Sequence, residues 1–306
     1  MPMAAKDSVG GVVRYRARVL YDGASFAGSQ VQPHKRTVAN VLEAALARRM
    51  QQQVRINCAS RTDTGVHARG QSVHFDLVRR HRDLPPGWEL AKSLNAMCPP
   101  AVQVTDVEEA LEMDDQGRLW HARLWATGKL YSYRISTGPH YDPLELRLRH
   151  HAYRSSLDLD AMVEAAGHMQ GEVDCAAFAN RRQGERPPRE LDDVLTRRVI
   201  RDIQIVDEGG GRLRADFHVQ SALYKMVRNM VGLLVAVGTH RVSAAAVPGL
   251  IASRDRDLLP PPVPAHGLTL ESVYYAEGWG GRYSHPLHGS KLCEGLGCEL
   301  PDDGDE

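Results

Sequence analysis

The sequence predicts an α+β protein whose strands pair mainly antiparallel. Stretches in which apolar and polar residues alternate recur along the chain, as half-buried strands require. Segments with apolar residues at helical spacing lie between them, so the order is strand, helix, strand, helix, twice over. The links are short, and DEGGG at 207–211 has the composition of a hairpin turn. Local connections of this kind favour antiparallel pairing.

The first cycle of elements begins with VRYRARVLYDG, which alternates apolar residues with three arginines. We expect a half-buried strand with a basic outer face. Thr37 is a candidate N-cap for the helix that follows, and Pro99-Pro100 end the second helix. The expected elements are strands at 13–23 and 71–78 and helices at 37–50 and 88–97.

The second cycle contains a strongly apolar helix at 223–238, but its longest near-apolar run, 230–237, is too short to cross a bilayer. The other expected elements are strands at 129–137, 197–206, 212–220 and 265–277 and a helix at 157–171. We therefore divide the chain into a disordered N-terminus (1–11), an N-terminal α+β subdomain (12–110), a C-terminal α+β subdomain (111–278) and an acidic flexible tail (279–306).

Composition is ordinary for a soluble globular protein, with 42% hydrophobic and 25% charged residues in 306. The N-terminus has neither an apolar signal core nor an Arg-rich transit pattern. Five scattered cysteines are typical of a reduced intracellular chain. We expect no membrane partner and a cytoplasmic location, with nucleus or organelle left open.

Net charge is zero, but its distribution is uneven. Residues 279–306 hold two basic residues and six acids, a net of −4, so the rest of the chain carries +4. Seven arginines against four acids lie in 181–201. A mildly basic body of this kind can follow a phosphate backbone, although on charge alone solvated arginines are the favoured explanation. We expect the basic strand face and the arginine clusters to hold phosphates.

A single acid, Asp63, stands in CASRTDTGVHARGQSVHFD, which has no other carboxylate until Asp76. Gly65 allows a turn with positive φ, and Thr62 and Thr64 can hold a loop through side-chain bonds to the backbone. Such a loop can present one acid at the end of a strand. The alternative is a structural ion pair between Asp63 and Arg61.

Several kinds of chemistry lack their usual motifs. A conventional glycoside hydrolase needs two carboxylates, and no second candidate lies near Asp63. No HExxH, CxxC, P-loop or GxGxxG after a strand is present, so we expect neither a metal nor another cofactor. The only alternative metal site, with spacing unusual for zinc, is formed by tail residues: His285, His288, Cys293 and Cys298.

The stretch SRTDTGVHARGQSVHFD resembles the active-site motif of the TruA family of tRNA pseudouridine synthases. The likeness extends over about residues 13–278, through YDGASFAGSQ, HARLWATGKLYSY, ALYKMVRNMVGLLVAVG and PAHGLTLESVYY. It implies a pseudouridine-synthase-like fold, with two α/β subdomains around a mostly antiparallel mixed sheet and a central RNA-binding cleft. Four residues depart from the family's pattern: Ser29, Thr64, Cys175 and Ala222.

The resemblance also implies roles for individual residues. Asp63 matches the catalytic nucleophile, Tyr131 the substrate-contacting tyrosine and Arg228 the arginine that pairs with the aspartate. Arg61, in the same loop, is expected to contact RNA. The implied reaction isomerises uridine to pseudouridine in tRNA, at about positions 38 to 40 of the anticodon arm. It needs no cofactor, and the family implies a homodimer.

Alternatives remain open at this stage. The chain could be a catalytically inactive RNA-binding relative, or a synthase that acts on other tRNA sites or on mRNA. A nucleoside hydrolase or glycosylase with one carboxylate would instead release free uracil. Without the resemblance, Tyr131 is a buried strand residue and Arg228 a polar rim on an apolar helix.

Overall fold

The computed structural model describes residues 11–79, 84–152, 156–181, 187–276 and 279. The longer strands are β1 (Val12–Tyr21), β3 (His67–Val78), β4 (Val102–Glu109), β5 (Ala126–Ser136), β8 (Arg197–Gly209), β9 (Arg212–Val219) and β10 (Leu268–Tyr275). The short strands are β2 (Asn57–Cys58), β6 (His150–His151) and β7 (Gly171–Asp174). The helices are α1 (Val38–Met50), α2 (Gly87–Met97), α3 (Leu159–Gly167), α4 (Asp193–Thr196), α5 (Met226–Gly238) and α6 (Val247–Ala252).

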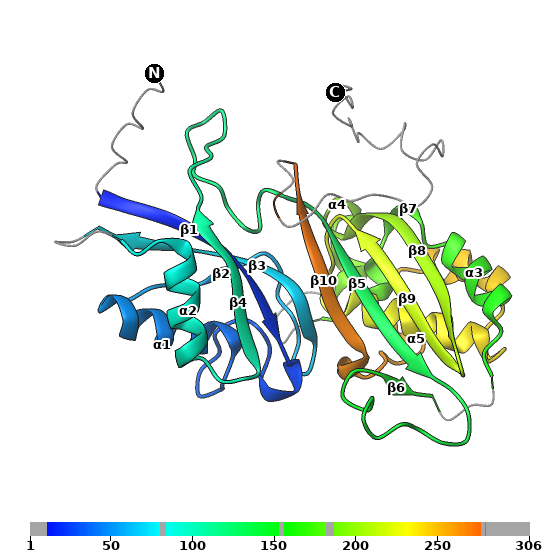
Figure 1. The fold of residues 1–306 in the computed structure, drawn as a ribbon. Coiled ribbons are helices and arrows are strands. Elements are labelled where there is room, and N and C mark those ends of the chain that lie inside the picture. The colour runs from blue at the N-terminus through cyan, green and yellow to red at the C-terminus, as the bar shows by residue number, and fades with distance from the viewer. Residues whose placement is uncertain (1–10, 80–83, 153–155, 182–186, 277–278, 280–306) are drawn as a thin grey trace, which may run out of the picture.

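One sheet runs through the molecule in the order β4-β1-β3-β10-β5-β9-β8-β7, with β2 paired to β3 and β6 to β5 (Figure 1). Only the pairs β3–β10 and β5–β6 are parallel within the part of the chain that the structure describes. The predicted α+β class with a mostly antiparallel mixed sheet is therefore confirmed.

The N-terminal half combines β1, β3 and β4 with α1 and α2. The hydroxyl of Thr37 accepts the Asn40 N–H at 3.2 Å, so the predicted cap of α1 is confirmed. The sequence interpretation missed β4, which follows Pro99-Pro100 almost at once. The alternation of Val102 and Val104 with polar residues is the signal that could have identified it.

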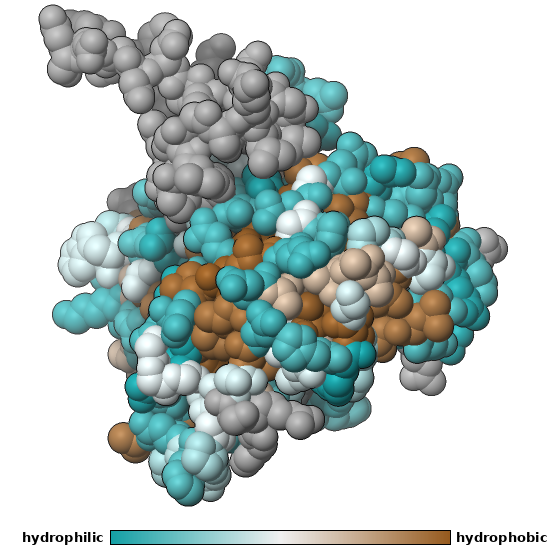
Figure 2. Space-filling view, turned by 90° about the vertical axis from the view of Figure 1, so that its right-hand side faces the viewer, coloured by the Kyte–Doolittle hydropathy of each residue, from teal (hydrophilic) through white to brown (hydrophobic). Residues whose placement is uncertain are grey.

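The C-terminal half combines β5, β8, β9 and β10 with α3 and α5. The predicted hairpin is confirmed, since β8 and β9 pair antiparallel and residues 209–211 all have positive φ. The apolar helix α5 is almost wholly buried and packs against α3. On the side where α3 lies, Figure 2 shows apolar residues gathered at the centre of the face between hydrophilic margins.

The two halves of the sheet join where β3 begins. β10 pairs parallel with β3 through His67–Thr269 and Ala68–Leu270 alone. The backbones come so close that a Cβ on Gly70 would lie 2.3 Å from the Glu271 carbonyl oxygen, so only glycine fits there. Because the Asp63 loop runs directly into β3, this junction places the loop between the halves.

The basic face of β1 is neutralised by neighbouring strands. Arg14 pairs with Asp76 at 2.7 Å, Arg16 with Glu108 at 2.7 Å and Arg18 with Asp106 at 3.2 Å. We therefore withdraw the expectation that this face holds phosphates, because each guanidinium already has a carboxylate partner. The partners come from β3 and β4, which the alternation in β1 alone does not reveal.

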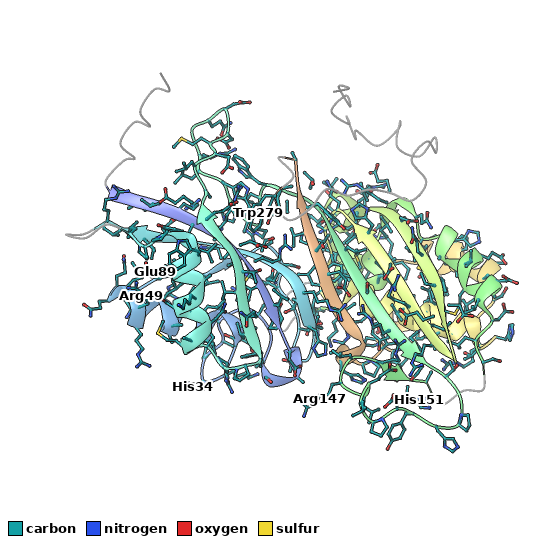
Figure 3. The ribbon with its side chains drawn as sticks, in the orientation of Figure 1. His34, Arg49, Glu89, Arg147, His151 and Trp279 are labelled. Carbon is teal, nitrogen blue, oxygen red and sulfur yellow. The ribbon has the colours of Figure 1, made fainter. Side chains whose placement is uncertain are left out.

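The two terminal segments are described only at Gly11 and Trp279. The sequence assigns Trp279 to a tail that stays apart from the body, and this is wrong for that residue. Its ring centroid lies 5.4 Å from that of Trp120 and 5.1 Å from the Arg16 guanidinium carbon (Figure 3). Aromatic and cation–π contacts explain the packing. The remaining tail, including the alternative zinc ligands, lies outside the described residues.

Among the described residues, no helix is long and apolar enough to span a membrane.

Candidate active site

The loop that carries Asp63 is clamped against residues 28–29. The Thr62 N–H donates to Ser29 Oγ at 2.8 Å, and the Ser29 N–H donates to the Thr62 carbonyl at 3.2 Å. Gly28, at φ +90°, brings the backbone so close that a Cβ would lie 2.7 Å from the Thr62 oxygen. Gly65 has φ +82°, so the positive φ predicted there is confirmed.

Side chains on both sides of the loop complete this clamp. The sequence predicts that Thr62 bonds to the backbone, but its hydroxyl lies 2.8 Å from the Tyr21 hydroxyl and anchors the loop through another side chain. Thr64 makes no side-chain hydrogen bond within the described part of the chain. Ser29 takes that role instead, and it is one of the four residues that depart from the motif.

Asp63 faces Arg228 across the junction between the two halves. The Arg228 Nη1 donates to Asp63 Oδ2 at 3.1 Å, while its Nε donates to the Val263 carbonyl at 2.8 Å. Both side chains are largely buried, with exposed fractions of 24% and 13%. Arg228 lies in the first turn of α5, where backbone N–H groups also favour negative charge. The carboxylate is thus oriented in a positive environment but remains accessible.

Tyr131 reaches the same site from β5. Its hydroxyl lies 2.8 Å from Ser60 Oγ, in the loop that leads to Asp63. Burial, and to a lesser extent the nearby Asp63 charge, raise the pKa of Tyr131 to about 12. The hydroxyl is therefore neutral near pH 7 and can donate or accept a hydrogen bond, but a phenolate is not populated.

A cavity of about 540 Å³ opens between these residues. One wall comes from the Asp63 loop and the other from residues 220–228, with β5 at its base. The cavity brings together all four predicted site residues: Arg61, Asp63, Tyr131 and Arg228. Its volume suits a small aromatic group with part of its sugar.

The lining of the cavity carries more positive than negative charge. Arg61 lies exposed at the loop and forms no ion pair within the described residues, so the alternative Asp63–Arg61 pair does not occur. Asp63 is the one acid in this lining, against five basic residues: Arg61, Arg123, Lys129, Lys225 and Arg228. Such a cavity attracts an anionic polymer more readily than a neutral metabolite.

Sequence reasoning missed several residues of this site. Ser29 and Ser60 position the loop and Tyr131, and Lys225 adopts the left-handed conformation, at φ +60°, just before α5. Lys129 is two residues before Tyr131 on the same strand, so period-2 alternation could have placed both on one face. Burial, with smaller contributions from two nearby arginines, lowers the pKa of Lys129 to about 8.

Within the described residues, no group of three or more His, Cys, Asp and Glu side chains is arranged to hold a metal ion.

Replacing Ser29 with alanine should slow the reaction without preventing substrate binding. The partly buried Thr62 N–H would lose its acceptor, which costs roughly 1 kcal/mol of folding free energy. Because a small displacement of a catalytic group is expensive, we expect the turnover rate to fall by roughly 10- to 100-fold. Single-turnover kinetics and denaturant unfolding measure the two effects.

Ser253→Ala is the matched control, because that hydroxyl is exposed and bonds only to nearby backbone: it donates to the Leu250 carbonyl and accepts the Asp255 N–H. We expect it to leave turnover unchanged. A Ser29→Ala protein with the wild-type turnover rate would show that the clamp does not position Asp63.

Comparison with known proteins gives a consistent result. The family model described as tRNA pseudouridine synthase matches residues 17–123 and 165–276. A tRNA pseudouridine synthase A from Myxococcus xanthus is 34% identical over 268 residues, covering 87% of this chain and 93% of the relative. One from Burkholderia multivorans is 38% identical over 264 residues, covering 86% and 90%.

Among solved structures, a Cbf5-Nop10-Gar1 complex aligns with 72% of this chain and 45% of its own chain. Its sequence identity is 13% and its TM-score 0.33, so this likeness carries no argument.

Proposed function

The chain belongs to the tRNA pseudouridine synthase family, whose members isomerise uridine to pseudouridine in tRNA, and we propose that Asp63 is its catalytic nucleophile. The observation that carries this proposal is the cavity itself, where Asp63 is the one acid of the described lining and faces Arg228 at 3.1 Å.

The reaction breaks the bond between uracil N1 and the sugar C1′, turns the base, and joins C5 to C1′. The proton on C5 is released as N1 gains one, so atoms and electrons balance within the nucleotide. Asp63 can attack C1′ as a nucleophile, or remove a sugar proton as a base in a route through a glycal. Either role needs an ionised carboxylate with an accessible oxygen.

The neighbours of Asp63 support such a role. Arg228 holds one carboxylate oxygen and leaves the other, Oδ1, without a hydrogen bond in the described structure. Tyr131 can stack on the base through its ring and offer a neutral hydroxyl for hydrogen bonding. A base inside a stem or loop must leave its stack to enter the cavity.

We propose that the target uridines lie in the tRNA anticodon arm, at about positions 38 to 40, as the family resemblance implies. We also propose a homodimer in the cytoplasm. The apolar surface in Figure 2, on the side where α3 lies, is of the kind that monomers rarely expose.

The decisive experiment maps pseudouridine in tRNA transcripts treated with the purified protein. Transcripts with cytidine in place of uridine at 38, 39 or 40 each remove one candidate target. We expect modification only where uridine remains in this arm. Modification confined to other tRNA sites or to mRNA would overturn the anticodon proposal.

The same tRNA incubations distinguish a synthase from the two alternative kinds of protein. Release of free uracil would indicate a glycosylase, and tight tRNA binding without any product would indicate an inactive relative.

A further inference from the structure

Most arginines of the sheet strands are neutralised by a carboxylate from a neighbouring element. The pairs include Arg14 with Asp76, Arg18 with Asp106, Arg134 with Glu271 and Arg214 with Glu208. In this protein, therefore, a partly buried basic side chain without a carboxylate partner is the exception that needs an explanation.

Three basic side chains that lack a carboxylate partner in the described structure lie near one another beside the cavity: the buried Lys129, the half-buried Arg198 and the exposed Arg123. None forms an ion pair within the described residues. Arg123 and Lys129 line the cavity, and both arginines lie close enough to Lys129 to lower its pKa. The Arg198 Nη1 donates to the Arg197 carbonyl, but its buried Nε has no partner in the described structure.

Lys129 is the centre of this cluster. Its side chain is on the same face of β5 as Tyr131, about 7 Å along the strand. On the other side, Lys129 pairs with Val219, which pairs with Ile200 of β8, two residues beyond Arg198. The strand order thus brings Arg198 toward Lys129, although 69 positions separate them in the sequence.

Lys129 is only 6% exposed, although no carboxylate balances it among the described residues. Burying an unpaired ammonium destabilises the fold. Burial and the two arginines lower the Lys129 pKa to about 8, so most of the charge remains near neutral pH. Three cations without counter-charges suit a ligand that brings its own negative charge.

We propose that Lys129, together with Arg123 and Arg198, binds a backbone phosphate of the RNA beside the target uridine. This inference rests on the proposed function, because that function places a uridine against Tyr131 and Asp63. In a flipped nucleotide, the flanking phosphates are joined to the base through a single ribose, so they stay close to it. Lys129 is two residues from Tyr131 on the same face of β5. A phosphate bound there would fix how deeply the nucleotide enters the cavity.

If Lys129 binds phosphate, replacing it should weaken RNA binding without destabilising the fold. Lys129→Met removes the charge but keeps an unbranched side chain of similar length. We expect the dissociation constant for an anticodon stem-loop RNA to rise by roughly tenfold. The slope of log affinity against log salt should fall by about 1. The melting temperature should stay the same or rise, because a buried unpaired charge is removed.

Two further variants complete this experiment. Lys129→Arg keeps the charge and should retain most of the affinity. Lys92→Met, on the exposed face of α2, is the matched control and should leave affinity and salt slope unchanged. Lower melting temperature with unchanged RNA affinity in Lys129→Met would show that the lysine is structural and would overturn the proposal.

A second experiment identifies the phosphate. Stem-loops carrying one neutral methylphosphonate linkage, either 5′ or 3′ of the target uridine or four nucleotides away, are titrated into wild type and Lys129→Met. At one flanking linkage, the methylphosphonate should weaken RNA binding to wild type but not to Lys129→Met. The neutral linkage and the lysine substitution remove the same contact, so their effects should not add. If every methylphosphonate lowers the affinity of wild type and Lys129→Met by the same factor, the phosphate assignment is overturned.

These measurements are made at equilibrium and need no turnover. If the phosphate coupling is found but no pseudouridine forms, the proposed function fails while the phosphate site stands. If pseudouridine forms but Lys129 couples to neither flanking phosphate, the phosphate site fails while the function stands.

Discussion

Replacing Asp63 with asparagine should abolish pseudouridine formation while leaving tRNA binding intact. Asparagine has nearly the same shape and can still accept a hydrogen bond from Arg228, but it is neither a nucleophile nor a base. Loss of a catalytic nucleophile typically lowers turnover by several orders of magnitude, so we expect a fall of at least about 10⁴-fold. Product should be measured under single-turnover conditions with enzyme in excess.

The binding measurement makes this prediction specific. The dissociation constant of Asp63→Asn should equal that of wild type or be slightly lower, because a negative charge leaves a cavity that receives phosphate. Asp76→Asn is the matched control: this carboxylate is on β3, pairs with Arg14 and lies outside the cavity lining. Its turnover should stay near wild type. Turnover by Asp63→Asn above a trace would refute the assignment.

Replacing Arg228 with methionine should have the second largest effect. The change removes the donor that holds Asp63 Oδ2 and the donor to the Val263 carbonyl. Removing one preorganised polar contact at a reacting centre typically costs roughly 10²- to 10³-fold in turnover, and we expect a loss in this range. The turnover rate should fall more than the affinity for tRNA, because the guanidinium positions the carboxylate.

Arg228→Lys tests whether charge alone is enough. Lysine is a point charge without the planar fork of arginine, so it cannot satisfy Asp63 and Val263 in the same geometry. We expect an intermediate loss of turnover. Arg241→Met, just beyond the end of α5, is the control and should behave as wild type. Wild-type turnover in Arg228→Met would mean that Asp63 needs no orienting partner.

Much of the fold could be predicted because its signals are local. The N-cap at Thr37, the β8–β9 hairpin and the positive φ of Gly65 depend on residues close in sequence, and all three are confirmed. The strand β4 was missed because the alternation of buried and exposed residues continues only through Val102 and Val104 before it breaks. The division into subdomains at residue 110 stays a prediction.

The site was only partly predictable, because half of its geometry comes from distant contacts. The motif singled out Asp63, Tyr131 and Arg228 through family resemblance. It did not indicate that Ser29 clamps the loop, since that bond joins residues 33 positions apart. Lys129 lies outside both stretches matched by the family model, and only burial and the lack of a carboxylate partner distinguish it from other lysines.

The sequence by itself determined the types and order of the long elements other than β4, and the residue types able to carry the reaction, because these follow from local periodicity and a contiguous motif. Only the tertiary structure decided which charges are available to a substrate. Arg14 and Asp76 are 62 positions apart and neutralise each other, whereas Arg228 reaches Asp63 across 165 positions. The physical reason is that a charge acts through space and through its local dielectric environment. Equally basic residues therefore became paired arginines on β1 and an unpaired, buried lysine at the cavity.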